Sequence, residues 1–208
     1  MQLAVIAAGI VLQVVAWRAV AAGRASVWRL IVALFAVEGV VAAIVLPPIA
    51  SGDQTVAVAL AAGAASGLVL WAGTLAFVAV AVRWQPFRAT VAEQYERAAE
   101  VSLPVAIALS ILLAVPGEEL FWRNLVQRRF GVSSEMVGAT VAWLGYVAVN
   151  AASGSLPLIA GAVVGGAVWG GLAWWSGGLA ASLASHGVWT ALMLARPPAS
   201  GRPEVTPG

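Results

Sequence analysis

The amino-acid sequence predicts an all-α, polytopic transmembrane helical bundle of about seven spans. The 208-residue chain is 62% hydrophobic and 10% charged, whereas soluble domains carry about half apolar and about a quarter charged residues. The apolar residues also occur in blocks close to the ~20 residues that a helix needs to cross a bilayer. The expected spans are Leu3–Trp17, Leu30–Leu46, Val56–Val82, a fourth that begins near Leu103, Val137–Ala152, Leu156–Trp175 and Leu179–Leu194.

Local features support these spans one by one. The first ends at Arg18, with no positively charged segment before it and no convincing signal-peptidase site after it, so we expect it to be retained. The second stops at Pro47-Pro48, where the missing amides prevent continuation of a helix. The third contains Gly63-x-x-x-Gly67, a spacing that lets a neighbouring backbone approach closely. The glycines of the sixth span are expected to serve helix packing, because no strand precedes them as a dinucleotide motif requires.

Two segments do not fit a membrane span. Residues 85–100 carry mixed charge and predict an amphipathic helix on the membrane surface. The segment beyond Arg196 is rich in Pro and Gly and is expected to be disordered. We therefore expect three regions, namely N-terminal transmembrane helices with the surface segment (1–100), a core that holds the motifs described below (101–195), and a tail (196–208).

The distribution of arginine predicts the orientation, because cytoplasmic loops of membrane proteins are enriched in positive charge. With the N-terminus outside, eight arginines fall on the expected cytoplasmic side and three on the other. The eight are Arg18, Arg24, Arg29, Arg83, Arg88, Arg97, Arg196 and Arg202, and the three are Arg123, Arg128 and Arg129. Trp17, Trp28 and Trp84 lie beside the first group and predict an interfacial belt.

Composition excludes several classes of function. All 11 basic residues are arginines scattered over short loops, which does not predict a nucleic-acid-binding surface. The chain has no cysteine, so a thiolate nucleophile and a cysteine metal cluster are excluded. The single histidine, His186, cannot form a zinc site of the usual two- or three-histidine kind. We expect neither a metal nor a cofactor.

Two adjacent carboxylates, Glu118 and Glu119, follow Pro116-Gly117 at the end of the fourth hydrophobic segment. An ionisable residue within a span costs at least ~2.5 kcal/mol, so the pair requires an explanation. Glu119 and Arg123 are four residues apart and can pair across one helical turn. Glu118 then points about 100 degrees away and can face a cavity as a general base or acid. Alternatively, all three charges lie at the water interface and cap a helix that starts after Pro116-Gly117.

Two further pairs of polar residues have the same four-residue spacing and so share a helix face. Tyr146 and Asn150 lie in the fifth span, and His186 and Thr190 lie in the seventh. A buried asparagine must satisfy both its amide and its carbonyl, which helix packing alone could require. A lone intramembrane histidine is more often a packed, hydrogen-bonded residue than a catalyst. Taken separately, neither pair identifies a site.

The order of these elements resembles the CPBP family of intramembrane glutamic proteases, an ABI-like group that includes the type II CAAX prenyl endopeptidases and bacteriocin-processing enzymes. Glu118-Glu119-Leu120-Phe121-Trp122-Arg123 is the specific part, followed by Tyr146-x-x-x-Asn150 and His186-x-x-x-Thr190. The resemblance covers roughly residues 100–195, whereas the first three spans match only in hydrophobicity. The family's second motif usually reads Phe-x-x-x-His and its third His-x-x-x-Asn or Asp.

The resemblance implies an endopeptidase that cuts a prenylated, lipid-anchored or helical-tail substrate near the surface of a bacterial cytoplasmic membrane. Glu118 would be the general base, positioned by Glu119 and Arg123. His186 and the residue at position 190 would stabilise the oxyanion. The family's second catalytic histidine is replaced by Asn150, which can orient a water but cannot accept its proton at neutral pH.

These implications fix the expected partners and the competing hypotheses. The partners are membrane lipids and a membrane-associated protein or peptide. If the chain is an enzyme, Glu118, Asn150 and His186 should approach within ~8 Å of a common point, because one water must reach the base and the oxyanion donors. The main alternative, favoured by Asn150, is a non-catalytic membrane scaffold or immunity-type protein. A small transporter is less well supported, because the sequence has no apparent inverted repeat.

Overall fold

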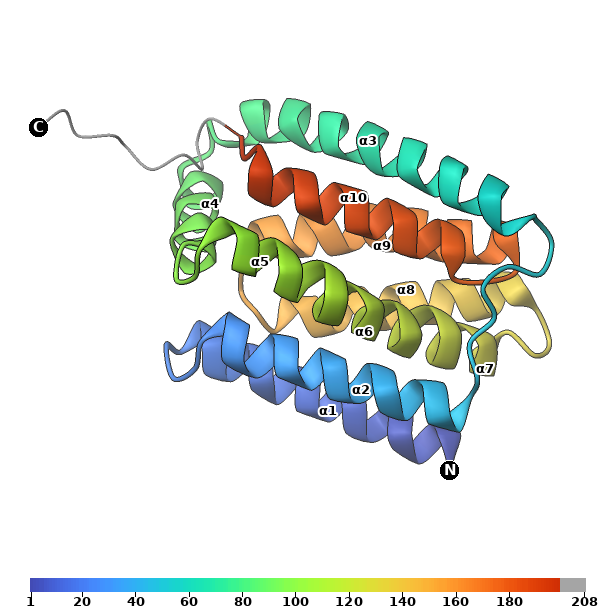
Figure 1. Cartoon of the computed structure of the whole chain (residues 1–208). Coiled ribbons are helices and arrows are strands. Elements are labelled where there is room, and N and C mark those ends of the chain that lie inside the picture. Colours follow the sequence, from blue (N-terminus) through green and yellow to red (C-terminus); the bar gives the residue numbers. More distant parts are fainter. Residues whose placement is uncertain (199–208) are drawn as a thin grey trace, which may run out of the picture.

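The computed structural model describes residues 1–198, and this part of the chain is built from helices and their connections (Figure 1). Several α-helices pass directly into π-helical turns, which are labelled η. The elements are α1 (Gln2–Ala21), η1 (Val27–Ile31), α2 (Val32–Val45), α3 (Val56–Ala81), α4 (Gln85–Ala98), α5 (Leu103–Leu109), η2 (Ser110–Ala114), α6 (Val115–Glu119), η3 (Leu120–Gln127), α7 (Arg128–Phe130), α8 (Glu135–Ala151), α9 (Leu156–Ser176) and α10 (Ala180–Ala195).

The long helices run alongside one another as an antiparallel bundle, and α4 lies across one end of it (Figure 1). Helices α1 and α2 form one side of the bundle, and α3 with α10 forms the opposite side. The helical segment from α5 to α7 lies between these two pairs, packed on α2 and α8. The α8–α9 pair completes the bundle. The predicted all-α class is confirmed.

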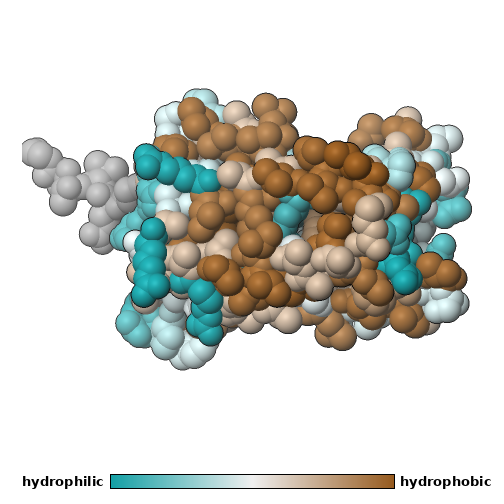
Figure 2. Space-filling model, turned by 90° about the horizontal axis from the view of Figure 1, so that it is seen from below, coloured by the Kyte–Doolittle hydropathy of each residue, from teal (hydrophilic) through white to brown (hydrophobic). Residues whose placement is uncertain are grey.

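The outer surface of the bundle is that of a membrane protein. Figure 2 shows a hydrophobic band across the middle of one face, with hydrophilic residues gathered at both ends. Five helical segments are long and apolar enough to cross a bilayer, namely Gln2–Ala21, Val27–Val45, Val56–Ala81, Leu103–Phe130 and Leu156–Ser176. The two other helices of the bundle, α8 and α10, have 17 and 16 residues. The chain is therefore an integral membrane protein, and within residues 1–198 a helix lies at each of the seven positions expected for a span, five of them long and apolar enough to cross a bilayer by themselves.

The fourth span does not end at Pro116-Gly117, as the interfacial alternative required. One helical segment of 28 residues runs from Leu103 to Phe130, with Pro116 in the first turn of α6. Proline lacks the amide that an α-helix uses, so it is tolerated where the hydrogen-bond pattern already changes. Here the π-helical turn η2 comes directly before α6 and supplies that change. Glu118 and Glu119 consequently lie inside the bundle, not at a new helix start.

Glycines bring helices into backbone contact, among other places between α3 and α10 and between α2 and α6. A Cβ atom on Gly63 would lie 3.0 Å from the Cα atom of Ala181, and one on Gly67 would lie 2.6 Å from the carbonyl oxygen of Ser185. The spacing of these two glycines thus joins α3 to α10, as the sequence predicts. The second contact was not foreseen, and it joins α2 to α6: a Cβ on Gly39 would lie 2.6 Å from the Cα atom of Gly117.

The arginine count requires one correction. Arg123 is only 3% exposed and lies in the bundle interior, so it does not belong to a loop. Of the three arginines assigned to the end of the bundle opposite α4, only Arg128 and Arg129 therefore lie there. This increases the difference in arginine number on which the predicted cytoplasmic position of the α4 end depends. Arg202 lies outside the described residues, as does most of the expected disordered tail.

The expected tryptophan belt is only partly formed. Trp84 is 58% exposed, but Trp17 is 5% exposed and packs in the core. Trp28 donates a hydrogen bond of 3.0 Å from its indole nitrogen to the carbonyl oxygen of Arg97 in α4. Trp17 and Trp28 therefore hold protein elements together instead of anchoring the protein in lipid headgroups.

Helix α4 is held to the bundle by an apolar face and by hydrogen bonds at its C-terminal half. Phe87 and Val91 are buried against Val78 of α3. The Tyr95 hydroxyl donates a 3.2 Å hydrogen bond to the carbonyl oxygen of Met193 near the end of α10. Burial raises the pKa of the Tyr95 phenol above its ordinary value, so this donor stays protonated. The predicted amphipathic surface helix is thus a docked part of the fold.

A valine substitution tests the glycine contact between α3 and α10. Gly63→Val should lower the free energy of unfolding by about 1–3 kcal/mol, because the added side chain overpacks against the Ala181 backbone. Gly73→Val in the same helix is the control, since a Cβ there meets nothing within 4 Å. Thermal unfolding in detergent should separate the two variants, and equal stabilities would contradict the contact.

The orientation can be tested with single cysteines, because the chain has none of its own. Cysteines replacing the exposed residues Arg24 and Arg88 should react with an impermeant maleimide only from the cytoplasmic side. A cysteine replacing Asp53 should react only from the outside. The opposite labelling pattern in right-side-out and inverted vesicles would reverse the orientation.

Candidate active site

A pocket of about 210 Å³ lies at the α4 end of the bundle and collects most of the polar residues singled out in the sequence. Glu118 of α6, Asn150 of α8, and His186 and Thr190 of α10 all line it. Much of the remaining wall is aromatic, and it includes Trp17, Trp28, Phe35, Tyr146, Trp169 and Trp189. Gln94, Arg97 and Ala98 of α4 also line it. Residues that are far apart in the sequence thus meet in one partly enclosed, mainly apolar cavity.

The Glu118 carboxylate is hydrogen-bonded to Tyr146. The Tyr146 hydroxyl donates to Oε2 of Glu118 over 2.7 Å. Glu118 is half-buried and faces the pocket, while its neighbour Glu119 is fully buried. The two adjacent carboxylates therefore point in different directions, as their positions on a helix require.

Glu119 lies behind the pocket between two basic side chains. Its Oε1 atom is 2.9 Å from Nδ1 of His186, and its Oε2 atom is 3.8 Å from Nε of Arg123. The first distance is a hydrogen bond, and the second is an ion pair that is too long to be one. Burying a carboxylate in a bundle is costly unless charge partners compensate it. The predicted Glu119–Arg123 pair is present, and His186 joins it.

His186 is held by stacking as well as by Glu119. Its imidazole lies against the indole of Trp169, with ring centroids 3.6 Å apart and an interplanar angle of 13°. Because a carboxylate only accepts hydrogen bonds, Nδ1 donates to Glu119, and the other ring nitrogen, Nε2, is left for the pocket. The histidine is therefore fixed in both tilt and rotation.

Arg123 connects this cluster to α9 and α8. Its Nη2 atom donates a 3.2 Å hydrogen bond to the carbonyl oxygen of Gly166. Its guanidinium also lies over the Tyr146 ring at 4.8 Å and over Trp169 at 5.7 Å, within the range of cation–π attraction. The predicted charge partner of Glu119 thus also supports the ring that contacts Glu118.

Asn150 binds its own helix backbone through its amide nitrogen. The Nδ2 atom donates a 2.9 Å hydrogen bond to the carbonyl oxygen of Tyr146, one turn earlier in α8. The amide oxygen remains as an acceptor at the pocket. Thr190 lines the pocket one turn beyond His186, as the spacing predicts.

The structure thus divides the six residues proposed from the sequence into two sets. Glu118, Asn150, His186 and Thr190 line the pocket, whereas Glu119 and Arg123 are buried beside it. The interfacial alternative for the charged residues is wrong, because Glu119 and Arg123 are 0% and 3% exposed.

Sequence reasoning did not assign a role to Tyr146 or to Trp169. A tyrosine within a span was a usable signal for Tyr146, since a buried hydroxyl needs a hydrogen-bond partner. No comparable signal marked Trp169, which lies among glycines that point only to helix packing.

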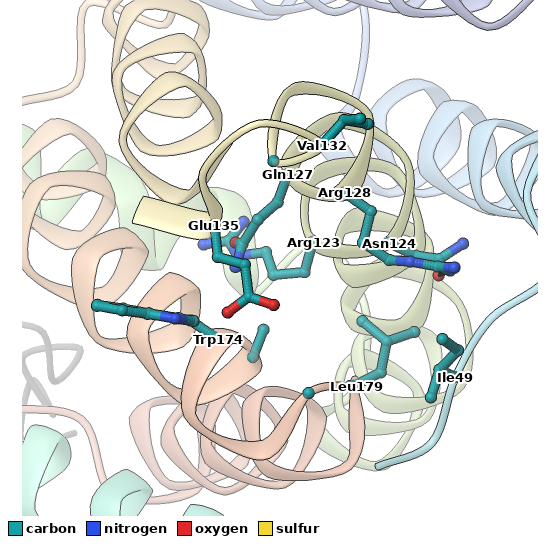
Figure 3. Close-up of a pocket in the computed structure, with 13 residues that line it drawn as sticks. Ile49, Arg123, Asn124, Gln127, Arg128, Val132, Glu135, Trp174 and Leu179 are labelled. Atoms are coloured by element: carbon teal, nitrogen blue, oxygen red, sulfur yellow. Dashed lines mark hydrogen bonds between the residues drawn. The ribbon is translucent and has the colours of Figure 1, made fainter. Parts of the chain in front are cut away.

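A second pocket, of about 260 Å³, opens at the opposite end of the bundle (Figure 3). Asn124, Gln127 and Arg128 line it from one helical segment, and Glu135 extends its carboxylate toward its centre. Asn124 and Arg128 already bind each other and the loop after α2: the Nη1 atom of Arg128 donates 2.6 Å to Oδ1 of Asn124 and 2.9 Å to the carbonyl oxygen of Pro47. None of the motif residues except Arg123 reaches this pocket.

Comparison with known protein families identifies the part of the chain that forms most of the first pocket. Residues 100–192 match the family described as type II CAAX prenyl endopeptidase, Rce1-like. This segment belongs to the CPBP family of membrane proteases. The matched range contains Tyr146 and all six site residues proposed from the sequence. Searches of curated proteins and of solved structures gave no match.

The family match does not include the whole pocket. Trp17, Trp28 and Phe35 come from the N-terminal helices, and the lining residues of α4 also precede residue 100. The CPBP segment therefore supplies the motif residues and part of the wall, and the N-terminal part of the chain supplies the rest of the wall.

Removing the charge of Glu119 should destabilise the protein more than removing that of Glu118. Glu119→Gln leaves the buried Arg123 without its carboxylate, and breaking a buried pair in this way costs about 3–5 kcal/mol. In Glu118→Gln the Tyr146 hydroxyl can still donate to the amide oxygen. Thermal unfolding of both variants in the same detergent measures the difference, and equal stabilities would show that the ion pair is not structural.

Proposed function

We propose that this protein is an intramembrane endopeptidase with Glu118 as its general base. Its substrate is a prenylated, lipid-anchored or helical-tail peptide whose scissile bond enters the pocket from the cytoplasmic end of a bacterial membrane. The observation that carries the proposal is the meeting of Glu118, His186 and Thr190 in one pocket of a segment that belongs to a protease family. The aromatic walls suit an apolar chain segment, and they restrict the entry of bulk water.

The first step is activation of water by Glu118. Its Oε2 atom is occupied by the Tyr146 hydroxyl, and its Oε1 atom is left to accept a proton. Asn150 offers an amide oxygen, which can accept a hydrogen bond from the same water and orient it. The hydroxide attacks the carbonyl carbon, and the proton held by Glu118 is then delivered to the leaving amine.

The second requirement is stabilisation of the tetrahedral oxyanion. His186 donates from Nδ1 to Glu119, so donation from Nε2 to substrate requires the doubly protonated ring. The Glu119 carboxylate offsets the charge of that ring, and Trp169 fixes its plane. Thr190 adds a hydroxyl donor from the next turn. Each such donor is worth about 3 kcal/mol in a site that excludes water.

One observation favours a second candidate, a non-catalytic membrane scaffold. Asn150 stands where the family usually has a histidine, and its amide hydrogen-bonds to its own helix backbone. A scaffold would keep the fold without needing the acid–base chemistry of Glu118. The two candidates therefore differ in what they require of the Glu118 charge.

Substitution of Glu118 separates these two candidates. Glu118→Gln should abolish cleavage of an internally quenched, farnesylated peptide in proteoliposomes, because an amide cannot accept a proton from water. Asn150→His should preserve or raise the rate of cleavage, since an imidazole can also accept a proton from water. Cleavage is measured as the gain in fluorescence, with product masses confirming the cut bond.

The control is Glu135→Gln, which removes a carboxylate from the second pocket and should leave cleavage unchanged. A Glu118→Gln variant that is as active and as abundant as the wild type would overturn the enzyme proposal. A cellular effect that survives Glu118→Gln would support the scaffold.

A further inference from the structure

We infer that the Tyr146 hydroxyl is the group that positions the Glu118 carboxylate for its work as a base. This inference rests on the proposed function, because it assigns a task within the same site. It gives a task to the first residue of the second motif, to which the sequence alone assigned no role.

The hydrogen bond between the Tyr146 hydroxyl and the Glu118 carboxylate is short and lies within the bundle. The donor–acceptor distance of 2.7 Å is typical of a hydroxyl that donates to a carboxylate. Among the hydrogen bonds of residues 1–198, it is the one that a side chain donates to Glu118. By engaging Oε2, the hydroxyl fixes the rotation of the carboxylate and leaves Oε1 to accept a hydrogen bond from water.

The position of the hydroxyl is set by packing around the ring and does not depend on Glu118. The Tyr146 ring meets Trp122 edge to face, with centroids 5.7 Å apart. The Arg123 guanidinium covers the ring at 4.8 Å. On another side, a Cβ on Gly166 would lie only 2.9 Å from the ring, so the ring and the α9 backbone are in close contact. A phenylalanine would keep all of these contacts and lose only the oxygen.

Asn150 does not perform this task in the structure. Its amide nitrogen donates to the Tyr146 carbonyl oxygen at 2.9 Å, and among residues 1–198 no hydrogen bond joins Asn150 to Glu118. A carboxylate needs a donor. Tyr146 therefore supplies the hydrogen bond to the base that position 150 does not.

Replacing only the hydroxyl tests the inference. Tyr146→Phe should lower kcat for the farnesylated peptide by about 10- to 100-fold, as expected for loss of a hydrogen bond to a charged group. KM should change less than about twofold, since the pocket keeps its shape. The matched control is Tyr95→Phe, which removes the hydroxyl of the other tyrosine in the chain, outside the pocket, and should keep the wild-type kcat.

An infrared measurement tests the interaction without relying on activity. The Glu118 carboxyl bands can be assigned by their loss in Glu118→Gln, and they should shift in Tyr146→Phe but not in Tyr95→Phe. Thermal unfolding of each variant checks that the fold is retained.

The combined results separate this inference from the proposed function. A shifted infrared band together with a lower kcat supports the inference. An unshifted band overturns it, and so does a shifted band with wild-type kcat. Failure of the wild-type protein to cleave any farnesylated peptide overturns the proposed function, and the infrared shift still reports on the contact between Tyr146 and Glu118.

Discussion

Compensation of the buried Glu119 charge is the constraint on which the site depends. A carboxylate with no exposed surface is tolerated only because His186 and Arg123 approach it from two helices. These contacts tie α6 and η3 to α10, and Arg123 extends the connection to α9 through Gly166. The same contacts orient the imidazole toward the pocket and support the Tyr146 ring. One electrostatic requirement therefore organises both the packing of the helices and the chemistry of the cavity.

Much of the architecture could be predicted from composition and spacing. Apolar blocks identify the spans because a bilayer imposes a length on them, and Gly63 and Gly67 identify a helix contact because only small residues permit it. The continuity of the helix through Pro116 could not be predicted. It depends on π-helical turns, which have no simple sequence signature and which relieve the missing hydrogen bond.

The candidate site was predictable to a similar degree. Helical spacing placed Glu119 beside Arg123, and the order of the motifs indicated which spans would meet. The contact of His186 with Glu119 needed the tertiary structure, because 67 residues separate them. The hydrogen-bond partner of the Asn150 amide could not be predicted from the sequence either, since a side-chain amide in a helix can donate to its own backbone or to a neighbour. Long-range pairings and rotamer choices are therefore the part that pattern alone did not reveal.

The contact between Gly39 and Gly117 bears on how this fold can change. Gly39 belongs to the N-terminal helices, and Gly117 directly precedes the two glutamates of the CPBP segment. Since the two backbones touch, a side chain at either position would displace α6 and the carboxylates with it. The N-terminal helices are consequently not an interchangeable membrane anchor. A chimera that joins residues 100–192 to foreign helices must carry a glycine facing Gly117. The sequences of the two parts of the chain must therefore change together in evolution at this contact.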